Sequence, residues 1–143
     1  MEELQEKSLH PPKAATAVAA AEKTQFSDLD QEVQLAVRCA ADKKATEMVV
    51  LDLRQIASFA EYFLIASGAN QRQVQAICDE IEEQLKKRLS TRPVRIEGYS
   101  SAEWVLMDYG DFIVHIFNKE AREFYDLERL WRDAGRVALP DDL

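Results

Sequence analysis

Cysteine and histidine are scarce in this chain. Its 143 residues include two cysteines, Cys39 and Cys78, and two histidines, His10 and His115. Because these residues lack the spacing of zinc ligands, we expect no metal site. Two cysteines also cannot build the disulfide framework of a small secreted domain. Both fall on the apolar stripes of predicted helices, so we expect buried free thiols in a reducing compartment, the cytoplasm.

Glycine is scarce as well, and the four glycines form no phosphate-binding pattern. Neither G-x-G-x-x-G nor a P-loop lysine is present, so we expect no cofactor. Ala66-Ser67-Gly68 comes before a predicted helix, but one glycine is weak evidence for an anion site, and we interpret it as an ordinary turn. A nucleotidyltransferase would place a glycine-serine turn ahead of a strand with two alternate carboxylates. Here the turn leads into a helix, and no later strand has an acidic-x-acidic pair.

Long apolar runs are missing too. A membrane-spanning helix needs roughly 20 consecutive apolar residues. The longest candidates here, Met48–Leu51 and Tyr62–Ala66, have the length of strands. We therefore expect no contact with a membrane.

Positive charge is also limited, because 18 basic residues face 26 acidic residues and the formal net charge is −8. The densest basic cluster is Lys86, Lys87 and Arg88, at the end of a predicted helix, where cations stabilise the helix dipole. No basic block could follow a phosphate backbone, so we expect no direct binding to nucleic acid. An acidic protein binds more readily to a basic protein surface.

What the chain does contain is enough apolar sequence for one folded domain, since 47% of its residues are hydrophobic. Residues 1–25 mix alanine, charge and a Pro-Pro pair, and we predict a disordered tail there. Residues 26–143 are predicted to form a single domain. The predicted elements are helices over 30–43, 70–89 and 120–133, strands over 47–53, 62–67 and 94–97, and a hairpin within 101–117. This order predicts an α/β or α+β fold with one mixed sheet of about five strands flanked by helices.

The most informative segment is Ser101–Phe117, which we interpret as a tight β-hairpin. Tyr109-Gly110 or Gly110-Asp111 forms the turn, because glycine supplies the positive φ that such turns need. Either register places the same residues on one face: Trp104, Leu106, Asp108, Ile113, His115 and Phe117. The other face carries Val105, Met107, Tyr109, Phe112, Val114 and Ile116 and should be core. The mixed character of the Trp104 face predicts partial exposure toward a partner.

Each polar residue of the hairpin also has a plainer explanation. Asp108 and Asp111 could act as paired catalytic carboxylates, but turn chemistry and contact with a partner explain them better. His115 is more consistent with a satisfied, partly buried imidazole than with a general base, because the hairpin has no serine or cysteine nucleophile within reach. Trp104 could be a core residue, although its mixed face favours a contact site. The predicted partner-binding residues are Trp104, Asp108, Tyr109, Asp111 and His115.

Several blocks of the sequence, taken in order, match one known family. They are Asp42-Lys43-Lys44, FAEYFLIASG, RQVQAICDEIEEQLK, Glu97-Gly98, AEWVLMDYGDFIVHIF and REFYDLERLW. From about Asp30 to Val137 the chain resembles the Iojap family of ribosomal silencing factors, RsfS. It departs from the family's usual Asp-Tyr or Asp-Cys at Glu61-Tyr62, which is a conservative change. The segment before Asp30 lies outside the resemblance.

The resemblance implies a factor without enzymatic activity that binds the large ribosomal subunit, on its fourteenth ribosomal protein. Such a factor blocks joining of the small subunit and represses translation when nutrients or energy are short. The implied fold is similar to a nucleotidyltransferase core without its catalytic carboxylates. Trp104 would anchor the interface, and Asp108 and Asp111 would pair with basic side chains of the partner. The alternatives are a nucleotidyltransferase-like enzyme and a general dimerisation module. The predicted partners also include a second copy of the chain, as a homodimer.

Overall fold

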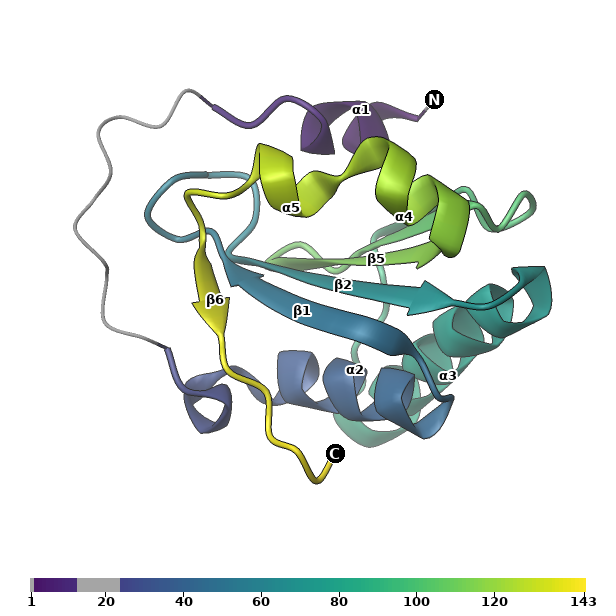
Figure 1. The fold of residues 1–143 in the computed structure, drawn as a ribbon. Coiled ribbons are helices and arrows are strands. Elements are labelled where there is room, and N and C mark those ends of the chain that lie inside the picture. The colour runs from purple at the N-terminus through teal and green to yellow at the C-terminus, as the bar shows by residue number, and fades with distance from the viewer. Residues whose placement is uncertain (1, 13–23) are drawn as a thin grey trace.

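The computed structural model describes residues 2–12 and 24–143, and these form one sheet between two layers of helices (Figure 1). The helices are α1 (Glu3–Ser8), the short 3-10 helix η1 (Phe26–Asp28), α2 (Gln31–Asp42), α3 (Gln71–Leu89), α4 (Lys119–Tyr125) and α5 (Leu127–Leu130). The strands are β1 (Thr46–Asp52), β2 (Tyr62–Gly68), β3 (Arg95–Glu97), β4 (Trp104–Asp108), β5 (Phe112–Asn118) and β6 (Gly135–Val137).

The sheet has six strands in the order β3-β4-β5-β2-β1-β6. Strands β2 and β5 are parallel, and the other neighbouring pairs are antiparallel. The predicted mixed sheet flanked by helices is therefore confirmed. Strand β6 was not predicted, because its short run Gly135–Val137 pairs with β1 without an alternating pattern of its own.

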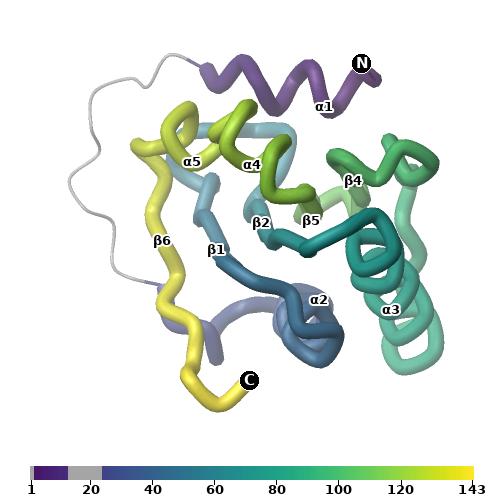
Figure 2. The backbone as a smooth tube through the Cα atoms, turned by 45° about the vertical axis from the view of Figure 1, so that its right-hand side comes forward, coloured from purple at the N-terminus to yellow at the C-terminus, as the bar shows by residue number. Residues whose placement is uncertain are grey.

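Helices α2 and α3 cover one face of the sheet and lie side by side beneath it (Figure 2). Their apolar stripes follow the predicted helical spacing, and the Asn70 side chain accepts a hydrogen bond from the backbone of Gln73 at 2.8 Å, as an N-cap does. Cys39 and Cys78 are buried free thiols in this layer, as predicted. Burial raises the pKa of Cys39 to about 11 and that of Cys78 to about 12. Both thiols are therefore protonated and unreactive at neutral pH.

Helices α1, α4 and α5 lie over the opposite face (Figure 1). The single helix predicted over residues 120–133 is wrong, because Asp126 adopts a left-handed conformation with φ of 48° and separates α4 from α5. The break also changes which side chains face the sheet. Leu127 and Trp131 are buried, whereas Phe124, predicted on the same apolar stripe, is 80% exposed.

The predicted disorder of residues 1–25 does not hold for Glu3–Ser8, which form α1. Gln5 and Ser8 are both buried. The Gln5 side chain donates to the Trp104 carbonyl on β4, and the Ser8 carbonyl accepts from the Trp131 indole at the end of α5. Composition could not indicate this helix, because it has no apolar stripe of its own. Polar contacts with residues far away in the sequence hold it in place. Residues 13–23 of the predicted tail lie outside the described residues. Within 2–12 and 24–143, no helix is long and apolar enough to cross a membrane.

Candidate functional site

The β4-β5 hairpin closes through Gly110 and Asp111. The Tyr109 amide donates to the Phe112 carbonyl at 3.0 Å, and Gly110 has φ of 87°. The Asp108 carboxylate accepts a hydrogen bond from the Gly110 amide at 2.8 Å, which confirms that turn chemistry explains this aspartate. The strand register pairs Trp104 with Phe117 and so confirms the predicted assignment of residues to the two faces.

The partial exposure predicted for the Trp104 face is wrong. Trp104 is 4% exposed and His115 is fully buried, because helices cover this face of the sheet. The Trp104 indole stacks on the Phe117 ring with centroids 5.1 Å apart, and the Tyr125 ring lies 4.7 Å from it. The indole Nε1 donates to the imidazole Nδ1 of His115 at 3.0 Å. The indole N–H of Trp104 and the Nδ1 of His115 therefore satisfy each other inside the core, and His115 is fully buried rather than partly buried as predicted.

His115 is held in its neutral form. An indole can only donate, so the Nδ1 of His115 must accept and the neutral ring carries its proton on Nε2. That Nε2 is buried and has no hydrogen-bond partner among the described residues. Burial, with a smaller contribution from the positive charge of Arg122, lowers the pKa of His115 to about 3. At neutral pH this imidazole is a packed core group, and its pKa is far below the range of a general base.

This lowered pKa predicts an acid-dependent loss of stability. The unfolded chain takes up a proton near pH 6.5, whereas the folded chain resists it down to about pH 3, so His115 reduces the free energy of unfolding progressively as pH falls through that window. Between pH 7 and about pH 5 we expect about 2 kcal/mol of loss from this group. Urea denaturation of wild type and His115→Asn at both pH values measures it. Equal losses in the two proteins would contradict the assignment.

Tyr109 lies on the opposite face of the hairpin from His115. Its ring stacks on Phe112 with centroids 4.9 Å apart, and its hydroxyl is buried without a hydrogen-bond partner among the described residues. Burial raises the pKa of this hydroxyl well above its usual range. Tyr109 therefore supports the hairpin from the α2-α3 side and does not present its hydroxyl to a partner.

The exposed part of the hairpin borders a hollow of about 390 Å³. We call it the tip groove; its lining residues are Arg54, Ala57, Ser58, Phe59, Ala60, Glu61, Gly110 and Asp111. The Glu61 amide donates to the Asp111 carbonyl at 2.6 Å and so fixes the hairpin tip against the β1-β2 connection. The β1-β2 connection was not predicted as part of a site, because its residues show no motif and only the fold brings them to the hairpin.

The tip groove is acidic. The only basic side chain that lines it is Arg54, whose guanidinium donates to the Asp52 carboxylate at 2.9 Å and is thereby neutralised. Asp111 is exposed and Glu61 is half-buried, and neither forms an ion pair among the described residues. Asp108 is half-buried and lies 3.8 Å from the Arg95 guanidinium, just beside the groove. The structure therefore exposes Asp111, leaves Asp108 and Tyr109 half-buried, and buries Trp104 and His115.

The groove does not have the composition of a metal centre. The described parts of the chain, 2–12 and 24–143, contain no group of three or more His, Cys, Asp or Glu side chains that could hold a metal ion. Its chemistry is that of an acidic, open surface beside an aromatic ring, Phe59, which suits basic side chains of a protein partner.

Comparison with known proteins identifies similar chains. The model of the family described as "Ribosomal silencing factor during starvation" matches residues 26–143. A curated relative from Halalkalibacterium halodurans, a ribosomal silencing factor RsfS, is 44% identical over 107 residues, covering 75% of this chain and 91% of the relative. The mouse mitochondrial assembly of ribosomal large subunit protein 1 is 28% identical over 102 residues, covering 70% of this chain and 45% of that protein.

The fold has solved counterparts as well. A crystal structure of a protein from Chromobacterium violaceum is similar with a TM-score of 0.69 and 32% sequence identity, covering 78% of this chain and 88% of that chain. The sheet between two helical layers is therefore shared with an experimentally determined structure. Helix α1 lies before residue 26, where the family match begins.

Proposed function

Because the chain belongs to the ribosomal silencing factor family, whose model covers residues 26–143, we propose that it binds the large ribosomal subunit and blocks joining of the small subunit. The family consists of regulatory, ribosome-associated factors rather than enzymes. We further propose that the docking site is the fourteenth protein of the large subunit, and that binding represses translation when nutrients or energy are limiting. The family match carries this proposal.

The charge of the chain supports a protein partner on the ribosome. Ribosomal proteins are basic, and a factor with net charge −8 is attracted to an exposed basic protein while the surrounding RNA repels it. We place the contact at the tip groove, with Asp108 and Asp111 facing lysine or arginine side chains of the partner. In this proposal Trp104 and His115 do not contact the partner, because both are buried. They support the shape of the hairpin from within the core.

The test is sedimentation of the purified protein with isolated large subunits, followed by addition of small subunits. We expect the factor to travel with the large subunit and to lower the yield of joined ribosomes. Gradient profiles that stay unchanged at saturating factor would rule out this function. Sedimentation of the factor alone in the same experiment reports whether it forms a homodimer.

A charge reversal at the tip groove tests the location of the contact. Asp111→Lys should slow association with large subunits by about tenfold at low salt and should weaken its dependence on ionic strength. The matched control is Asp42→Lys, which makes the same charge change on an exposed residue at the C-terminus of α2. Association rates measured over a salt series decide the question. Similar rates for the two variants would place the interface elsewhere.

A further inference from the structure

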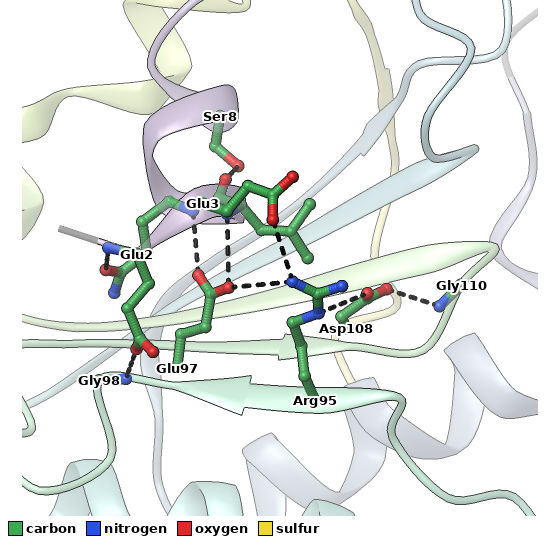
Figure 3. A network of polar contacts seen from close by, with 10 residues as sticks. Glu2, Glu3, Ser8, Arg95, Glu97, Gly98, Asp108 and Gly110 are labelled. Carbon is green, nitrogen blue, oxygen red and sulfur yellow. Dashed lines mark hydrogen bonds and ion pairs between the residues drawn. The ribbon is translucent and has the colours of Figure 1, made fainter.

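Helix α1 is held on the sheet by a buried carboxylate. Glu97, on β3, is 3% exposed, and its oxygens accept hydrogen bonds from the backbone amides of Gln5 at 3.1 Å and Leu4 at 3.4 Å (Figure 3). These amides belong to the first turn of α1, where backbone N–H groups have no partner within the helix. The sheet thus supplies the acceptor that this helix end needs.

Three further contacts between α1 and the body of the protein are also polar. The Gln5 amide side chain donates to the Trp104 carbonyl at 2.8 Å, and the Trp131 indole donates to the Ser8 carbonyl at 2.8 Å. The Gly98 amide donates to the Glu2 carboxylate at 2.8 Å (Figure 3). The apolar part of the contact comes from partly buried Leu4 and Leu9. The body therefore offers donors and acceptors arranged for the backbone and side chains of a helix.

Two charged side chains of α1 contact residues that line the proposed partner site or lie next to it. The Lys7 ammonium lies 5.1 Å from the centre of the Phe59 ring, which lines the tip groove. Glu3 lies 3.6 Å from the Arg95 guanidinium, which also faces Asp108 (Figure 3). Lys7 thus places a cation on an aromatic ring of an acidic groove. This is the chemistry that we propose for a basic ribosomal protein at the same place.

The attachment of α1 is suited to release. The helix has six residues, fewer than an isolated helix needs to be stable in water. Its ion pair with Arg95 is exposed, so it contributes about 0 to 1 kcal/mol. Helix α1 also precedes residues 26–143, the part of the chain that the family model matches.

We propose that α1 is a displaceable cap, an internal ligand whose contacts with Phe59 and Arg95 compete with those of the large ribosomal subunit at the border of the tip groove. The inference rests on the proposed function and concerns its regulation. While α1 is docked, the Lys7 ammonium lies over the Phe59 ring, and Glu3 pairs with the Arg95 guanidinium, which also faces Asp108. Binding of the subunit displaces the helix. The apparent affinity is therefore the intrinsic affinity multiplied by the fraction of molecules in which α1 is undocked.

Full-length variants test this competition. Gln5→Ala with Lys7→Ala removes a buried hydrogen bond and the cation at Phe59, and we expect the double variant to bind large subunits about five- to tenfold more tightly than wild type. Lys7→Ala alone changes an exposed residue and should give a smaller gain in the same direction. The matched control is Lys43→Ala, which removes the same charge from an exposed residue at the C-cap of α2. Any gain from the lost charge alone appears in this control, so the cap accounts only for the gain beyond it.

Hydrogen exchange provides a second measurement that does not depend on a variant. In the wild-type protein, the amides of Leu4 and Gln5 should lose protection when large subunits are added in excess. Binding with these amides still protected, or variants that bind no more tightly than wild type, would overturn the cap while leaving the proposed function intact. If neither wild type nor any variant binds large subunits, both the cap and the proposed function are wrong.

Discussion

Replacing Trp104 by alanine is expected to lower the free energy of unfolding by about 3 to 5 kcal/mol, because the change empties a buried aromatic site. The indole is 4% exposed and packs on Phe117 and Tyr125. Its loss also leaves the Nδ1 of His115 without a donor. Urea denaturation measures the effect.

Trp104→Phe is the matched control for this prediction. It keeps an aromatic ring in the core and removes the hydrogen bond to His115, so the expected loss is about 1 to 2 kcal/mol. The competing interpretation is the one that the sequence favoured, in which Trp104 anchors a partner. A Trp104→Ala variant with wild-type stability and weakened binding to large subunits would restore that interpretation.

Replacing Arg122 by methionine is expected to cost about 3 to 5 kcal/mol of stability. The side chain is 6% exposed, and its guanidinium donates to the Ser67 hydroxyl, the Glu47 carbonyl and the Glu128 carboxylate, each at 2.7 Å. Methionine fills similar space but leaves these acceptors without their donor. Glu47 has φ of 51° beside an irregularity in the β1-β2 pairing, so Arg122 also holds a strained point of the sheet.

Arg129→Met is the control for Arg122. Arg129 lies on α5, its side chain is 68% exposed, and it pairs with Asp126 at 3.1 Å. Exposed pairs of this kind contribute about 0 to 1 kcal/mol, so the control should unfold close to wild type. Thermal and urea denaturation of both variants compare a buried cation with an exposed one. A similar, small loss in the two variants would show that the Arg122 contacts add little to stability.

The sequence predicted those parts of the fold that depend on local pattern. The stripes of α2 and α3 and the cap at Asn70 follow from spacing, and the two faces of the hairpin follow from strand parity around a short turn. Burial of the mixed face could not be predicted in the same way. Alternation along a strand says which residues share a face, but not whether a helix from elsewhere covers it.

The candidate site was predictable only at its tip. Asp108 and Asp111 are near the surface because they flank the turn, and the turn is visible in the sequence. The rest of the tip groove comes from residues 54–61, which meet the hairpin only once β2 pairs with β5. The break at Asp126 was likewise invisible, because a residue with positive φ that is not glycine carries no clear signal in its sequence.

The hydrogen bond between Ser8 and Trp131 joins residues 123 positions apart, and it has a consequence for how the chain is made. A ribosome releases the N-terminal residues first, so the surface that holds α1 is incomplete until Trp131 has left the exit tunnel. Throughout most of its own synthesis, the nascent chain therefore carries an undocked α1. The helix can settle only onto a chain that is nearly finished.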